Sequence, residues 1–281
     1  MPAPNTPTVL PHGAPAPGWL RLVLDAEPVG WLPPAHADRV QGLALGAGAY
    51  QRDAHRLQLQ SPAGVGQASE QVAARSDWMQ GLARQLRARG AVSGWRDELY
   101  RAECDPADAS DPAALAQRGP AFFRMERAAF RFFGLRSRAV HVNGLTPQGQ
   151  LFCGRRAAHK ATDPGRLDNL AAGGLGADED VVDCARRELW EEAGVPLALS
   201  GALQAQGVIL SRRIEPEGLH EELLHVYLLR LPEGFSPHNQ DGEVSGFECL
   251  SLAACRQRMA DADFSPDAAL VSALLLESIG G

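Results

Sequence analysis

The sequence is nearly devoid of lysine: Lys160 is the only one, and every other residue of the Lys/Arg class is arginine. It also lacks an apolar run of about 18 residues, the length that a membrane-spanning helix needs, so we expect no membrane segment. The chain does not start with a basic stretch followed by an apolar one, as a signal peptide would. We therefore expect residues 1–18, which are rich in proline, to form a flexible tail.

Cysteine is scarce, and its spacing excludes two classes of site. The five cysteines are odd in number and contain no CxxC pair: Cys104, Cys153, Cys184, Cys249 and Cys255. A disulfide framework and a cysteine-based metal site are both disfavoured, which points to a reducing cytoplasm. The net charge of −7 disfavours a nucleic-acid or anionic-membrane partner.

The length of 281 residues allows one large domain or two modest ones, with ordinary apolar and charged fractions of 45% and 22%. Residues 19–135 are expected to form an α/β accessory domain. We predict its helices at 34–45, 67–89 and 122–133, its strands at 57–60 and 98–101, and a loop at 104–119. The aromatic residues of segment 122–133 are interpreted as core, with a wall of a substrate pocket as the alternative.

The pattern changes at Arg136, and residues 136–281 are expected to form a second domain. Two apolar segments at 139–145 and 150–156 flank a Thr-Pro-Gln-Gly turn, which is typical of a hairpin. Further strands are predicted at 202–214, 222–231 and 246–250, and helices at 252–259 and 266–278. With the acidic helix described next, this order favours an α+β fold in which helices cover both faces of a mixed sheet.

One acidic stretch, Gly173 to Val195, organises this second half. Asp178 is a plausible N-cap for a helix, and Glu179 and Asp180 suit the positive end of its dipole. An apolar stripe at helical spacing is expected to pack on the sheet: Val181, Val182, Ala185 and Leu189. Gly194 is suited to a left-handed C-cap, and Pro196 prevents continuation.

Three carboxylates share one face of this predicted helix, because Glu188, Glu191 and Glu192 stand at i, i+3 and i+4. Such a cluster is tolerable with a bound cation or with shifted pKa values. Oxygen ligands suit Mg²⁺, with Mn²⁺ as an alternative. Arg187 is able to reach back to Glu179 as an ion pair. The competing interpretation is a solvated acidic helix face.

The stretch also fills every fixed position of a 23-residue pattern: Gly173, five residues, Glu179, seven residues, Arg187-Glu188-Leu189, one residue, Glu191-Glu192, one residue, Gly194-Val195. This pattern resembles the Nudix box. The resemblance implies a Nudix α/β/α sandwich and a hydrolase that cleaves diphosphate linkages.

Sequence outside the box, notably residues 154–174 and 229–252, resembles a Nudix group labelled thiamine-pyrophosphokinase-related. Members of this group carry an extra N-terminal domain of roughly a hundred residues. The resemblance implies activity on thiamine diphosphate analogues, oxidised or damaged, giving the monophosphate and phosphate.

The resemblance also implies roles for individual residues. Metal would be bound by Glu188, Glu191, Glu192 and the backbone of Gly173, with Glu179, Arg187 and Gly194 supporting the motif. The general base is either Glu188 or Glu243, the latter in the loop before the last strand.

Five polar residues between the hairpin and the box are candidates for substrate contact: Arg155, Arg156, Lys160, Asp168 and Asn169. Arginine and lysine suit phosphate oxygens, but two arginines at a strand end are also a common surface pair. Asp168 and Asn169 could instead form turns. His220 and His225 are interpreted as core or surface residues.

Together these features predict a Mg²⁺-dependent Nudix diphosphatase with a small-molecule diphosphate substrate and no nucleic-acid or membrane partner. Two alternatives stay open: a diphosphatase for another nucleoside diphosphate-type metabolite, and a non-catalytic, metabolite-binding regulatory module. A homodimer is also left open.

Overall fold

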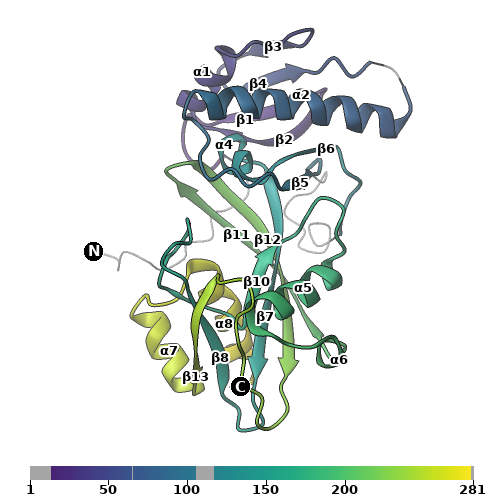
Figure 1. Ribbon diagram of the computed structural model, residues 1–281. Helices are drawn as coiled ribbons and strands as arrows, with labels where there is room; N and C mark the ends of the chain where they lie inside the picture. Colours follow the sequence, from purple (N-terminus) through teal and green to yellow (C-terminus); the bar gives the residue numbers. More distant parts are fainter. Residues whose placement is uncertain (1–13, 65, 106–116, 280–281) are drawn as a thin grey trace.

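The structure is a computed structural model that describes residues 14–64, 66–105 and 117–279. It has an upper body of N-terminal segments and a lower body built on a long sheet (Figure 1). Most of the predicted tail and much of the predicted loop at 104–119 lie outside the described residues. In the described part of the chain, no helix is long and apolar enough to cross a membrane.

The upper body is built on a four-stranded sheet of order β2-β1-β4-β3. Its elements are β1 (Leu20–Leu24), β2 (Glu27–Leu32), α1 (Pro34–Gln41), β3 (Ala49–Arg52), β4 (Arg56–Gln60) and α2 (Ala68–Ala88). Leucines alternate along β1 and β4 and are buried, as are Met79, Leu82 and Leu86 of α2. The helix predicted at 67–89 is confirmed as α2, whereas α1 ends four residues before the predicted Leu45.

The helix predicted at 122–133 is wrong over its first part. Residues Phe123–Glu126 form strand β6, which pairs with β5 (Leu99–Ala102), followed by the short helices η1 (Arg127–Ala129) and α4 (Phe130–Phe133). Phe123 and Met125 are fully buried, and the Glu126 carboxylate accepts from the Ala128 N–H, which ends the strand. Pairing with β5 therefore outweighs the helical spacing of the aromatic residues.

The lower body is a mixed seven-stranded sheet with the path β11-β12-β7-β8-β13. Its strands are β7 (Arg136–Leu145), β8 (Leu151–Arg156), β9 (Leu167–Asp168), β10 (Ala171–Gly174), β11 (Gln204–Glu215), β12 (Gly218–Arg230) and β13 (Val244–Leu250). Strands β7 and β12 are parallel, and the other pairs are antiparallel. Short β9 and β10 pair with β8 and β7, so part of the segment between the hairpin and the acidic helix, to which the sequence analysis assigned no strand, enters the sheet.

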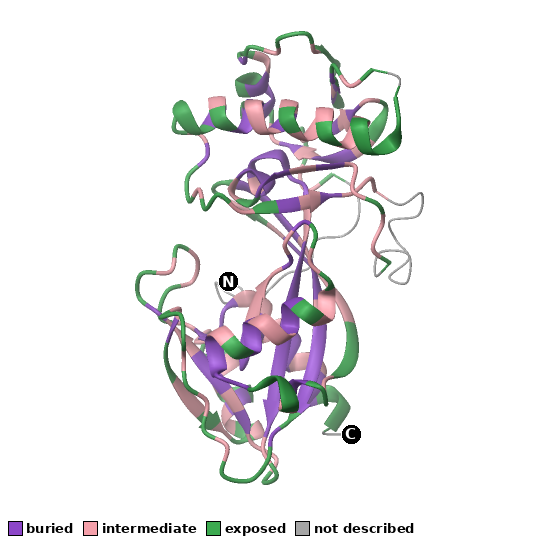
Figure 2. Cartoon of the chain, turned by 45° about the vertical axis from the view of Figure 1, so that its right-hand side comes forward, coloured by how far each residue is buried: buried purple, intermediate pink, exposed green. Residues whose placement is uncertain are grey.

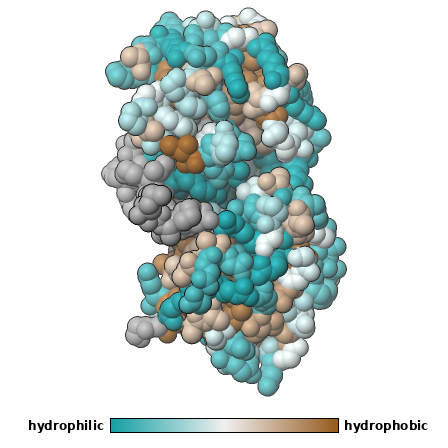
Figure 3. All heavy atoms as spheres, turned by 90° about the vertical axis from the view of Figure 1, so that its left-hand side faces the viewer, coloured by the Kyte–Doolittle hydropathy of each residue, from teal (hydrophilic) through white to brown (hydrophobic). Residues whose placement is uncertain are grey.

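Helices cover both faces of this sheet, which confirms the predicted α/β/α layering (Figure 1). On one face lie α5 (Val181–Ala193) and α6 (Leu197–Ser200), and on the other lie α7 (Leu252–Ala260) and α8 (Pro266–Ile279). Separate apolar clusters fill the two interfaces, and Figure 2 shows the sheet as the most deeply buried part of the lower body. The molecular face in Figure 3 is mostly hydrophilic, with small apolar patches.

The two bodies are tied together by close backbone packing. Strand β12 contacts α4, and a Cβ at Gly218 would overlap the carbonyl oxygen of Arg131. The Trp31 N–H donates to the Gly134 carbonyl at 3.3 Å. The upper body therefore rests directly on the ends of β7 and β12, the central strands of the lower sheet.

Candidate active site

Helix α5 carries the predicted carboxylates and is capped at both ends. Its N-cap is Asp180, whose side chain accepts from the Val182 N–H, and not the predicted Asp178. Asp178 instead forms an ion pair with Arg124 at 2.6 Å. At the other end Gly194 has φ 63°, the left-handed conformation predicted for it. With the cap at Asp180, residues 175–179 form the loop that leads from β10 to the helix.

Two of the three box glutamates are buried against the strand that precedes this loop. Glu188 and Glu192 are 8% and 5% exposed. Glu192 Oε2 accepts from the Ala172 N–H at 2.9 Å, and a Cβ at Gly173 would overlap the Glu188 carboxylate. Glycine at 173 thus allows the carboxylate to approach the backbone of β10. Glu191 is more exposed, at the solvent side of the cluster.

Arg187 links three glutamates of the motif. Its Nε lies 2.7 Å from Glu179 Oε1, and its Nη1 lies 2.7 Å from Glu188 Oε1 and 3.0 Å from Glu191 Oε2. The hydrogen bonds that Arg187 donates to Glu179 raise the pKa of Arg187 above its ordinary value, so it stays charged. Arg187 therefore joins the loop to the helix and fixes the direction of two carboxylates.

Burial and mutual repulsion disfavour the ionised forms of the glutamates in this cluster. Burial raises the pKa of Glu188 to about 7, against the lowering effect of Arg187. Burial, then the charges of Glu188 and Asp168, raise the pKa of Glu192 well above its ordinary value. A divalent cation would relieve both penalties, and carboxylate oxygens are the ligands that Mg²⁺ and Mn²⁺ prefer. The residues present fit such an ion.

Lys160 and Glu243 approach the cluster from two other loops. The Lys160 ammonium pairs with the Glu243 carboxylate and lies 4.0 Å from Glu192 Oε1. Burial raises the pKa of Glu243, but the hydrogen bond and charge of Lys160 outweigh burial and lower it overall. The structure thus places Lys160, a candidate phosphate contact, and Glu243, a candidate general base, next to the box glutamates.

Arg156, Asp168 and Asn169 form a supporting network. Arg156 Nη1 lies 2.7 Å from Asp168 Oδ2, and Asp168 Oδ1 accepts from the Asn169 N–H. Asn169 is buried, and its side chain bonds His141, Asn143 and Ser272. Arg156 and Asp168 face the cavity described next, whereas Asn169 fixes the turn between β9 and β10.

Arg155 is not brought to this site. Its guanidinium pairs with Glu248 and lies 3.1 Å from Asp263 Oδ1. Glu248 and Asp263 also pair with Arg258 of α7, on the other face of the sheet. The predicted contact of Arg155 with substrate has no support in this geometry, because both of its neighbours are carboxylates.

A cavity of about 650 Å³ extends from the box residues to the upper body. From the lower body it is lined by Lys160, Gly173, Glu188, Glu191 and Glu243, and from the upper body by Arg96, Glu98, Tyr100, Arg127, Phe130 and Arg131. Glu192, Arg155 and Asn169 do not line it. Of these upper-body residues, only Phe130 was among those that the sequence suggested for a pocket wall, as the alternative to a core role; strand pairing and the packing of α4 on β12 bring the others here.

The upper body also holds the loop between Gly173 and α5. The Ala177 N–H donates to the Leu99 carbonyl, and Arg101 Nε donates to the Ala177 carbonyl, both at 2.9 Å. A Cβ at Gly174 would overlap the hydroxyl of Tyr100, which is 5% exposed. Strand β5 is therefore part of the support of the site.

The chain is similar to one described protein family and to several individual proteins. Residues 135–270 match the NUDIX domain family. Nudix hydrolase 24, chloroplastic, from Arabidopsis thaliana is 39% identical over 168 residues, 59% of this chain and 43% of the plant protein. The uncharacterized Nudix hydrolase SCO1686 from Streptomyces coelicolor is 31% identical over 153 residues, 54% of this chain and 75% of that protein.

An isopentenyl-diphosphate Delta-isomerase from Jannaschia sp. is 30% identical over 138 residues, 48% of this chain and 75% of the isomerase. The chain spans less than half the length of the plant relative.

Proposed function

Because this chain belongs to the Nudix hydrolase family, we propose that it is a divalent-metal-dependent hydrolase that cleaves a diphosphate linkage in a small molecule. The observation that carries the proposal is the arrangement of Glu188, Glu191 and Glu192 beside Gly173, with the Lys160 ammonium 4.0 Å from Glu192. An acidic helix face that served solubility would expose its carboxylates, whereas two of these three are buried.

The chain's own groups have distinct roles in this proposal. Glu188, Glu191, Glu192 and the Gly173 carbonyl would hold Mg²⁺, which would neutralise phosphate charge and acidify a bound water. Lys160 sits where it can exchange Glu243 for a phosphate oxygen of the substrate. Arg187 keeps Glu188 and Glu191 oriented, and Arg156 keeps Asp168 oriented.

The general base is either Glu188 or Glu243. Glu188 has a pKa of about 7, close to the value that suits proton transfer at neutral pH. Glu243 has a lowered pKa while Lys160 is paired with it, and loss of that pair to a phosphate would raise its basicity.

For the substrate we propose a thiamine diphosphate analogue, oxidised or damaged, which would give the monophosphate and phosphate. Another nucleoside diphosphate-type metabolite is the alternative within enzymes, and a non-catalytic regulatory module is the alternative outside them. We also propose a cytoplasmic location, as expected from the cysteine pattern.

The test is phosphate release from a panel of diphosphates by the full chain, first with Mg²⁺ and then with EDTA. The panel includes thiamine diphosphate, its oxidised analogues, nucleoside diphosphates and isopentenyl diphosphate. We expect release that stops with EDTA. Rearrangement of isopentenyl diphosphate without phosphate release would favour the activity named for the isomerase relative, and binding without any turnover would favour the regulatory module.

Glu192→Gln should fold normally and lower kcat at least about a hundredfold, the scale of losing one charged group in an active site. Asp183→Asn is the matched control, because Asp183 lies on the same helix with its side chain 67% exposed. Activity of Glu192→Gln close to that of Asp183→Asn at saturating Mg²⁺ would remove the box from the mechanism.

A further inference from the structure

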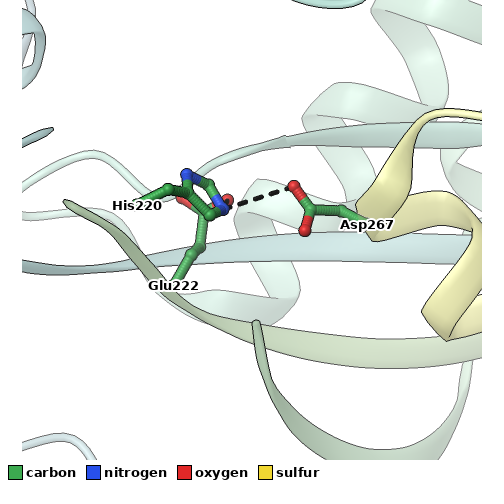
Figure 4. Close-up of side chains that lie close together, drawn as sticks. All are labelled: His220, Glu222 and Asp267. Carbon is green, nitrogen blue, oxygen red and sulfur yellow. Dashed lines mark ion pairs between the residues drawn. The ribbon is translucent and has the colours of Figure 1, made fainter. Parts of the chain in front are cut away.

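A second cluster of metal-binding side chains lies beside the cavity, apart from the box glutamates. His220 and Glu222 of β12 meet Asp267 in the first turn of α8 (Figure 4). One ligand atom from each lies within 4.8 Å of the others. His220 Nε2 is 3.4 Å from Asp267 Oδ2 and 3.8 Å from Glu222 Oε2. All three residues line the cavity.

His220 is buried without a hydrogen bond for one ring nitrogen. The residue is 4% exposed, and within the described residues Nε2 has no hydrogen-bond partner. The same nitrogen points toward the Asp267 carboxylate in Figure 4. A buried imidazole nitrogen that lies 3.4 Å and 3.8 Å from two carboxylate oxygens, without a well-aligned hydrogen bond to either, is a weakly satisfied group, which costs stability.

Neighbouring hydroxyls orient both carboxylates. Ser137 Oγ donates to Glu222 Oε1 at 2.7 Å, which leaves Oε2 on the side of His220. Ser211 Oγ donates to Asp267 Oδ1 at 2.5 Å, and Oδ2 is the oxygen nearest His220. Partners that fix a ligand's direction in this way are typical of metal centres.

Arg213 also contacts Asp267, with Nη1 at 2.6 Å from Oδ1 and Nη2 at 3.2 Å from Oδ2. Arg213 also pairs with Glu215, so its single positive charge does not neutralise the carboxylates of Glu222 and Asp267.

We propose that His220, Glu222 and Asp267 bind a divalent transition-metal ion of the Zn²⁺ class. Ligand bonds of 2.0–2.1 Å in tetrahedral geometry put ligand atoms about 3.3 Å apart, and the two measured separations approach this value. Imidazole favours Zn²⁺ and Co²⁺ over Mg²⁺, whereas the box offers oxygen alone. Three protein ligands leave one position open, and it faces the cavity.

This site goes beyond the proposed hydrolase. It would join β12 to α8 and present a second positive charge to a molecule in the cavity. The box site and this site differ in ligand chemistry, so they can be loaded and removed separately.

The experiment is a Co²⁺ titration of metal-free full-length protein, followed by visible absorption, with Zn²⁺ as competitor. We expect wild type to show the intense bands of four-coordinate Co²⁺ with a nitrogen ligand, and Zn²⁺ to abolish them. Glu192→Gln, which disables the box, should keep the bands. His220→Gln and Glu222→Gln should each lose them and bind Zn²⁺ at least about tenfold more weakly.

Thermal unfolding gives a second measurement. Zn²⁺ should raise the Tm of wild type and of Glu192→Gln, and should raise the Tm of a folded His220→Gln by less than that of wild type, because only the box remains to bind it. The proposal is overturned if wild type lacks the bands, or if His220→Gln and Glu222→Gln both match wild type. The cluster would then hold a proton instead of a metal ion. Loss of phosphate release in Glu192→Gln with the bands retained would separate this site from the proposed hydrolase site.

Discussion

At the scale of single residues, Lys160 stands between the carboxylates of Glu243 and Glu192 with its ammonium directed at the box. If it binds a substrate phosphate, Lys160→Ala should weaken transition-state binding by roughly 1.5–3 kcal/mol, the range for a charged hydrogen bond. The measurement is kcat/KM across triphosphate and diphosphate substrates, and the loss should be smaller for substrates with fewer phosphates.

Arg155→Ala is the control for Lys160→Ala, because Arg155 belongs to the same strand–loop segment and pairs with carboxylates away from the cavity. Its kcat/KM should match that of wild type once folding has been checked. An unchanged kcat/KM in Lys160→Ala would make Lys160 a structural partner of Glu243 alone.

His225 gives a pH-dependent prediction away from the box. Burial, then the charge of Arg138, lower its pKa to about 4 from an ordinary 6.5. Between these values the unfolded chain binds the proton and the folded chain does not, so stability rises with pH in this window and is lost as pH falls. From pH 7 to pH 4 wild type should lose on the order of 3 kcal/mol more unfolding free energy than His225→Gln.

The measurement is urea unfolding of both proteins at several pH values in EDTA. Glutamine keeps an acceptor for Arg138, whose Nη1 lies 3.3 Å from His225 Nε2, without adding a titrating group. Parallel pH profiles for the two proteins would mean that His225 is protonated equally in the folded and unfolded chains.

The sequence identified box residues well, because their spacing encodes one helix face. It could not distinguish Arg155 from Arg156. Neighbouring side chains on a strand point to opposite faces, so one of the two had to face away from the cavity. Which one does so depends on the register of β8 with β9 and β13, which is set by pairing far along the chain.

At the scale of elements, strand β5 supports the loop that leads to α5. Gly174→Ala places a methyl group on the Tyr100 hydroxyl, so either the loop or Tyr100 must move. We expect a loss of about 1–3 kcal/mol of unfolding free energy and a lower kcat, since the glycine loop and Glu188 are adjacent. The measurements are urea unfolding and steady-state kinetics.

Tyr100→Phe removes the hydroxyl and should partly rescue Gly174→Ala, because the ring carbon behind it is the next atom, at 2.5 Å from the added Cβ. Gly176→Ala is the matched control, since its nearest contact is 3.5 Å away. Additive losses in the double variant would show that the two residues do not interact.

Most element types in the lower body were predictable, because alternation and turn residues mark strands and caps locally; β9, β10 and α6 were not, since each has four residues or fewer and shows no period. Segment 122–133 was not, since its aromatic spacing also suits a helix and β5, its partner, lies about twenty residues earlier. Similarly, Asp178 and Asp180 are both suitable caps in sequence. The pairing of Asp178 with Arg124 of β6 leaves the cap to Asp180.

At the scale of the whole molecule, the cavity joins reactive groups of the lower body to a wall of the upper body. The aromatic residues of that wall are nearly closed off, since Tyr100, Phe130 and Phe132 are 5%, 3% and 1% exposed. Arg127 covers the Tyr100 ring at 5.2 Å from its centroid. The upper body therefore presents charged side chains to the cavity, and its aromatic rings lie beneath them. The aromatic residues of this wall thus offer little exposed surface to a substrate.

A residue on this far wall should contact the part of a substrate that does not react. Arg127→Ala should therefore raise KM about tenfold for a substrate that reaches the wall and leave kcat nearly unchanged, since binding lost equally from ground and transition states appears in KM. A short alkyl diphosphate that ends before the wall should show no change. Arg124→Ala is the control, because Arg124 pairs with Asp178 and does not line the cavity. A fall in kcat for both substrates would instead mean that Arg127, which pairs with Glu98 at 2.6 Å, supports β5 and through it the glycine loop.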